Sequence, residues 1–133
     1  MKTLTRLGTF DDVLADATPE VAKICLDLRE VIGALHPDCV EVPRPGEHSS
    51  SYGFGEKKMS ESYAYIMPQS EHANLGFYHG VNILPGNPSL EGTGKKLRHI
   101  KVRSEEVAHS PEVRKALIDA IQERKDALGV TNR

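Results

Sequence analysis

Two segments of the chain carry apolar residues at helical spacing, one near each end of the sequence. The first helix is expected to begin after Thr18, where the run Thr-Pro-Glu offers a capping hydroxyl and a proline suited to the first turn. The second begins after Ser110 with the similar run Ser-Pro-Glu and is expected to end at Gly129, a residue type common at helix C-termini. A short helical turn is predicted over residues 10–15, with Thr9 as its cap.

Each long helix is predicted to bury one face and expose the other. The apolar positions are Val21, Ile24, Cys25, Leu28, Val31, Ile32 and Leu35 in the first helix, and Val113, Leu117, Ala120, Ile121 and Leu128 in the second. The polar positions expected to face solvent are Glu20, Lys23, Asp27 and Glu30 in the first helix, and Lys115, Arg124 and Lys125 in the second. Both helices should therefore pack against another layer of structure.

Between the helices the pattern changes to short apolar runs separated by proline, glycine and charged residues. Such runs are typical of strands, and five are predicted, over residues 39–42, 49–54, 60–67, 72–78 and 97–102. Their tight connections favour antiparallel pairing, because parallel neighbours need long crossovers. The order of elements predicts a single α+β domain over residues 1–133. Its sheet should have about five strands, mainly antiparallel, with the N- and C-terminal helices packed on one face.

Composition and charge narrow the class of protein. The 133 residues carry a net charge of -2 and a pI near 6.3, which argues against nucleic acid as a partner. No apolar run approaches the ~20 residues needed to cross a bilayer, and residues 1–4 do not resemble the start of a signal peptide. We therefore expect a cytoplasmic protein with no membrane partner. Cys25 and Cys39 lack the spacing of a disulfide framework or a zinc site, so both are expected to be buried thiols.

The densest group of glycines, cations and histidines lies between Asn74 and Ser104. The run Gly-Thr-Gly-Lys-Lys at 92–96 lacks the spacing of a P-loop and precedes a strand rather than a helix, which excludes nucleotide hydrolysis by such a loop. One interpretation is a small-molecule or anion site, which could also belong to an enzyme. Its candidate ligand-binding residues are Tyr78, His79, Gly94, Lys95, Arg98 and His99. The alternative is a turn with solvated lysines, in which Arg98 forms a structural ion pair with Glu91.

Alternation along the last predicted strand assigns its side chains to two faces. Ile100 and Val102 are expected to face the helices, whereas Lys101 and Arg103 should lie on the open face of the sheet. A protein-interaction module or a homodimer is a further interpretation, because three tyrosines are candidates for the same open face: Tyr63, Tyr65 and Tyr78.

Metal binding is better suggested by carboxylates than by histidines. The six histidines have no HxH or HxxxH spacing, so a transition-metal site built from them is not expected. Carboxylates near the N-terminus could hold iron, calcium or magnesium loosely, and the candidates are Asp12, Asp16 and Glu20. The alternative is a solvated helix face. The chain has neither a GxSxG elbow nor a GxGxxG loop, so no catalytic residue is assigned and an enzyme is not expected.

A long signature occupies the centre of the chain, formed by residues 72–80, 84–85 and 90–103, with two further matches at 28–30 and 51–55. It resembles the signature of the YdhG-like family of small intracellular bacterial proteins. Where that family commonly has Asp-Pro after the Leu-Pro pair, this chain reads Gly-Asn-Pro. The resemblance implies a compact α+β fold with helices packed on a sheet.

The resemblance also implies a function, because a member of the wider family is described as a frataxin-like iron chaperone. Frataxins use acidic side chains on a helix and an adjoining strand. The first hypothesis is therefore a non-enzymatic binding protein, an intracellular iron chaperone that holds iron weakly. The second is an anion-binding or small-molecule-binding domain at the Gly-Thr-Gly-Lys turn, and the third is a protein-interaction module.

Overall fold

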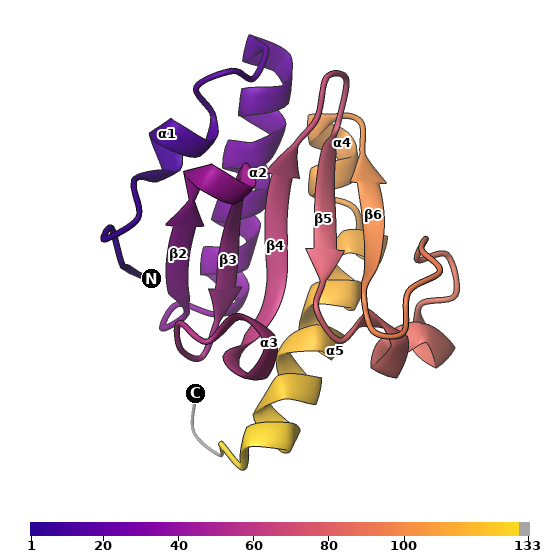
Figure 1. Ribbon diagram of the computed structural model, residues 1–133. Coiled ribbons are helices and arrows are strands. Elements are labelled where there is room, and N and C mark those ends of the chain that lie inside the picture. The colour runs from indigo at the N-terminus through magenta and orange to yellow at the C-terminus, as the bar shows by residue number, and fades with distance from the viewer. Residues whose placement is uncertain (131–133) are drawn as a thin grey trace.

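A six-stranded sheet forms the centre of the computed structural model, which describes residues 1–130 (Figure 1). The strands lie side by side in chain order: β1 (Lys2–Thr3), β2 (Val40–Arg44), β3 (Ser49–Gly53), β4 (Ser62–Pro68), β5 (Ala73–Phe77) and β6 (Arg98–Val102). Neighbours from β2 to β6 pair antiparallel, as predicted. The prediction was about five strands, and β1 adds a sixth that pairs parallel with β2.

Two long helices, α2 (Pro19–Leu35) and α5 (Pro111–Leu128), cover one face of the sheet (Figure 1). Their predicted starts are confirmed: the Thr18 hydroxyl accepts a hydrogen bond from the Val21 amide at 3.2 Å, and the Ser110 hydroxyl accepts one from the Val113 amide at 3.3 Å. Gly129 ends α5 with a φ of 70°, a conformation that glycine adopts without strain. The class of fold is therefore α+β.

Five shorter elements connect the strands and helices. They are α1 (Phe10–Val13), η1 (Pro45–Glu47), α3 (Lys58–Glu61), η2 (Gly80–Gly86) and α4 (Glu105–Ala108). Thr9 caps α1 as predicted, and the helix is shorter than the expected 10–15. No helix within residues 1–130 has the length and hydropathy needed to cross a membrane.

The core fills the space between the two helices and the sheet. Leu28 and Ile32 of α2 and Leu117 of α5 are fully buried there, together with Leu75 and Phe77 of β5. Val102 is fully buried and Ile100 packs against the core, so the predicted alternation of β6 is confirmed.

Two polar residues expected to face solvent, Asp27 and Arg124, and one tyrosine that was a candidate for the open face, Tyr63, are buried. Asp27 lies 2.7 Å from Lys23 Nζ and 3.7 Å from His109 Nε2, because α4 packs over this side of α2. Arg124 donates a hydrogen bond to the Ser60 carbonyl at 3.0 Å, because the end of α3 reaches α5. Tyr63 packs with His36 and Phe54 in the core rather than on the open face. The opposite error is Leu128, which is exposed at the end of α5.

Candidate functional site

Arg98, the central cation of the predicted anion site, holds the glycine turn together. Its Nη1 donates hydrogen bonds to the carbonyl oxygens of Gly94 and Leu97, both at 2.6 Å. Its stem lies against Gly80, where an added Cβ would approach Arg98 Cβ to 2.5 Å. The alternative, an ion pair between Arg98 and Glu91, does not form. Glu91 instead pairs with Lys101, whose Nζ lies 3.9 Å from the Glu91 carboxylate. Arg98 therefore has a structural role in the turn.

The other residues predicted for that site are engaged separately. Tyr78 is buried, with its ring centroid 5.2 Å from that of Tyr65. The His79 ring nitrogen Nε2 is hydrogen-bonded to the Met59 carbonyl, whereas His99 lies opposite Gly76 in the sheet. Lys95 and Gly94 are exposed in the turn. The cavities described below take no lining residue from this group.

A polar cavity of about 380 Å³ lies where three segments meet: the end of α1, the η1 turn and the β4–β5 loop. Its volume falls within the range of small-molecule sites. The lining residues are Asp12, Val13, Asp16, Ala17, Pro45, His48, Pro68, Gln69 and Ser70. Two of the three predicted metal-ligand candidates, Asp12 and Asp16, thus share a concave surface. Glu20 does not line it.

Asp12 is fixed in this cavity by the cap of α1. Its Oδ2 accepts a hydrogen bond from the Thr9 amide at 2.9 Å, and the Thr9 hydroxyl accepts one from the Asp12 amide at 3.1 Å. This leaves the other carboxylate oxygen, Oδ1, for a ligand. Asp16 is exposed and forms no ion pair or side-chain hydrogen bond with any residue in the described range. Both carboxylates therefore have oxygens free to accept a ligand.

His48 brings an imidazole to the same cavity, a residue that sequence reasoning did not select. It follows η1 with φ 54° and ψ 34°, and within residues 1–130 it alone among non-glycine residues has a positive φ. Its amide donates to the Pro45 carbonyl at 3.0 Å, which closes the turn. The spacing of the histidines in the sequence could not indicate this residue, because His48 comes to the same cavity as Asp12 and Asp16 only in the folded chain. The Pro-Gly run before it predicted the turn.

The cavity combines two carboxylates with one imidazole, a donor set that suits divalent first-row metals. Among residues 1–130 no group of three or more His, Cys, Asp or Glu side chains is placed to hold a metal ion. A metal ion here would therefore need these side chains to move toward one another, or would be held by fewer than three of them.

A second polar centre, around Glu41, is satisfied internally. The fully buried carboxylate accepts hydrogen bonds from Arg29 Nε at 2.6 Å, Arg29 Nη2 at 2.9 Å, the Tyr52 hydroxyl at 2.7 Å and the Thr3 hydroxyl at 2.8 Å. Burial raises the pKa of Glu41, but these hydrogen bonds, led by those from Arg29, outweigh it and hold the pKa below its usual value. A cavity of about 290 Å³ lies beside the pair. Because its acceptor sites are filled, Glu41 is a structural anchor.

The two cysteines are buried free thiols, as predicted. Burial raises the pKa of Cys25 to about 12 and that of Cys39 to about 11. Both therefore remain protonated near neutral pH and are poor nucleophiles.

None of the protein-family models, curated proteins and solved structures compared with this chain matches it. We therefore infer its function from the residues of the cavity and their chemistry.

Proposed function

We propose that this chain is a non-enzymatic binding protein that holds ferrous iron weakly in the cavity of Asp12, Asp16 and His48, as an iron chaperone of the cytoplasm. The observation that carries the proposal is the shared lining of one cavity by two carboxylates and an imidazole. Ferrous iron accepts both oxygen and imidazole ligands. Because the protein supplies few ligands, water fills the remaining positions and the cargo can pass to an acceptor.

The arrangement of elements supports the same proposal. A helix, an antiparallel run of strands and a second helix follow in chain order from α2 through β6 to α5, with both helices on one face. This is the arrangement that the YdhG-like and frataxin-like resemblance implies. Asp12 lies on a helix, α1, whereas no acidic residue of a strand lines the cavity.

The strongly shifted titratable groups favour binding over catalysis. Catalytic groups with shifted pKa values usually gather in an accessible cleft. Here burial raises the pKa of Tyr52, Tyr63, Tyr78, Cys25 and Cys39, none of which lines the cavity. A protein that only carries iron needs exposed ligands and no activated nucleophile.

An anaerobic titration with Fe²⁺, followed by amide NMR, tests the proposal. Paramagnetic iron should broaden the signals of residues 12–17, 45–48 and 68–70 first, and Asp16→Asn should reduce the effect. A matched control is Asp126→Asn, which removes a carboxylate from a different acidic cavity of about 370 Å³ between η2 and α5. Broadening that centres on α5, or none at millimolar iron, would contradict the proposal.

A further inference from the structure

Arg44, at the end of β2, is a buried cation whose only ion pair within residues 1–130 is a long one, 4.0 Å from Nη1 to Glu47 Oε2. Its side chain is only 10% exposed, against 37% for Arg29. Arg29 nevertheless has a carboxylate at 2.6 Å, whereas Arg44 Nε donates to the Ser51 hydroxyl at 3.2 Å and Nη2 donates to the Glu56 carbonyl at 2.9 Å. Both acceptors of Arg44 are neutral. Buried charges in proteins are normally paired with a hydrogen-bonded counter-charge.

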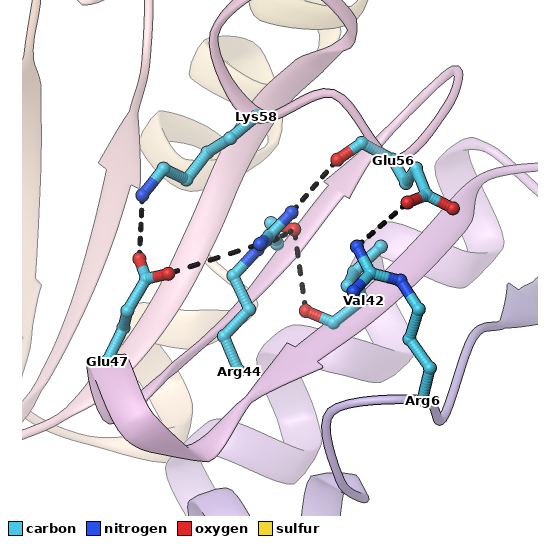
Figure 2. A network of polar contacts seen from close by, with 7 residues as sticks. Arg6, Val42, Arg44, Glu47, Glu56 and Lys58 are labelled. Atoms are coloured by element: carbon cyan, nitrogen blue, oxygen red, sulfur yellow. Dashed lines mark hydrogen bonds and ion pairs between the residues drawn. The ribbon is translucent and has the colours of Figure 1, made fainter.

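The Glu47 carboxylate is shared between Arg44 and Lys58, and it lies closer to Lys58. Glu47 Oε2 lies 4.0 Å from Arg44 Nη1, beyond hydrogen-bonding distance, while Oε1 accepts a hydrogen bond from Lys58 Nζ at 2.7 Å. Figure 2 shows Glu47 and Lys58 reaching toward each other from separate segments, with the Arg44 guanidinium between Glu47 and Glu56. Glu47 and Lys58 are both partly exposed, so their ion pair contributes little and can open readily.

A neutral donor, the Tyr78 hydroxyl, belongs to the next side chains along the sheet from Arg44. Arg44 Nε donates to the Ser51 hydroxyl. Ser51 lies opposite Tyr65 in the sheet, and the Tyr65 ring centroid lies 5.2 Å from that of Tyr78. Burial raises the pKa of Tyr78 most, the Arg44 guanidinium lowers it and Glu47 raises it, so its hydroxyl stays protonated within the field of both charges. Neither this hydroxyl nor Arg44 Nη1 forms a hydrogen bond with any residue in the described range. Both atoms therefore keep a hydrogen bond to give to a ligand.

We propose that Arg44, Lys58 and Tyr78 form a binding site for an oxyanion, the carboxylate or phosphate group of a small molecule. In the free protein the Glu47 carboxylate stands in for that group. The ligand displaces Glu47 and accepts hydrogen bonds from Arg44 Nη1, from Lys58 Nζ and from the Tyr78 hydroxyl. Arginine suits this task because its planar fork matches two oxygens of one anion. The site shares no residue with the lining of the proposed iron cavity.

The test titrates the folded protein with inorganic phosphate and, separately, with acetate, at an ionic strength held constant with chloride. Amide NMR reports the site and the dissociation constant. Glu47→Gln removes the competing charge, so it should tighten binding by up to about fivefold. That factor corresponds to the free energy of an exposed ion pair. Tyr78→Phe and Lys58→Gln should weaken it. The tighter of the two probes identifies the ligand group as phosphate or carboxylate.

Glu56→Gln is the matched control. Its side chain is 46% exposed, against 47% for Glu47, and it pairs with Arg6, while only its backbone carbonyl contacts Arg44. It should leave the affinity for either probe unchanged. Equal tightening by Glu47→Gln and Glu56→Gln would overturn the proposal, since it would report net charge alone. So would binding of neither probe, or signal changes centred on Lys95 and Lys96 with none at Arg44 and Tyr78.

Discussion

Glu47 and His48 are consecutive residues whose side chains lie in two different places on the protein. Glu47 accepts a hydrogen bond from Lys58 Nζ at 2.7 Å, whereas His48 lines the cavity that also contains Asp12 and Asp16. The positive φ of His48, 54°, turns the chain between η1 and β3 and so separates the two side chains. One short turn therefore holds a residue of the proposed iron cavity and a residue of the proposed oxyanion site.

Replacement of His48 separates its backbone role from its imidazole. His48→Val should lower the free energy of unfolding by about 1–2 kcal/mol, because a β-branched residue is strained at a positive φ. His48→Gly should keep the free energy of unfolding within about 0.5 kcal/mol. Both variants should weaken Fe²⁺ binding equally. Urea unfolding and iron titration measure the two effects, and full iron affinity in His48→Gly would show that the imidazole is not a ligand.

Glu41→Gln tests the buried anchor between β2 and α2. The substitution removes the charge that Arg29, Tyr52 and Thr3 stabilise, and we expect a loss of about 2 kcal/mol in the free energy of unfolding. The loss is smaller than for a fully buried pair, because Arg29 is partly exposed and can be rehydrated. Glu91→Gln, in a surface pair with Lys101, should change stability by less than about 0.5 kcal/mol. Equal losses of stability from the two substitutions would contradict the assignment of Glu41 as a structural anchor.

The same carboxylate should make stability depend on pH in the acid range. Its pKa in the folded protein lies below the ordinary value of 4.5, so the folded state favours the charged form. The stability it contributes is fully present above pH 4.5 and is lost as pH falls through the folded pKa. The difference in unfolding free energy between the parent and Glu41→Gln should therefore be largest near pH 7 and shrink below pH 4.5. A difference that stays constant down to pH 3 would contradict the lowered pKa.

Replacement by alanine should lower stability at one glycine, Gly53, and leave it unchanged at another, Gly94. A Cβ at Gly53 would lie 2.2 Å from the Glu61 carbonyl oxygen and 2.5 Å from Ser62 Cα, both backbone atoms, so Gly53→Ala should cost about 3 kcal/mol. A Cβ at Gly94 would meet nothing within 4 Å, and Gly94 has no positive φ. Gly94→Ala should be neutral in thermal unfolding. A large loss at Gly94 would instead indicate that the turn needs glycine there.

Local sequence signals predicted the helices and most strands well. The caps at Thr18, Ser110 and Gly129 depend on residues close in sequence, so they could be identified without tertiary information. β1 could not, because its two residues are a strand only through pairing with Val40 and Glu41, far along the chain. Asp27 and Arg124 were misplaced for a related reason, since α4 and α3 cover them only after folding.

The candidate site was predictable only in part. Asp12 and Asp16 were selected from charge, but the cavity depends on η1 and the β4–β5 loop returning to α1. That return adds His48 and leaves Glu20 outside the lining. Arg44 lies outside the strand predicted over residues 39–42, whereas in the structure it ends β2 and is buried.

A calorimetric titration of Fe²⁺ into two variants tests the proposed iron cavity most directly. Asp16→Asn and Glu20→Gln each remove one exposed carboxylate from the same acidic segment, but only Asp16 lines the cavity. Asp16→Asn should weaken binding by about tenfold, or about 1.4 kcal/mol, while Glu20→Gln should leave the dissociation constant within about twofold. Equal weakening in both variants, or in neither, would show that iron is not held in this cavity.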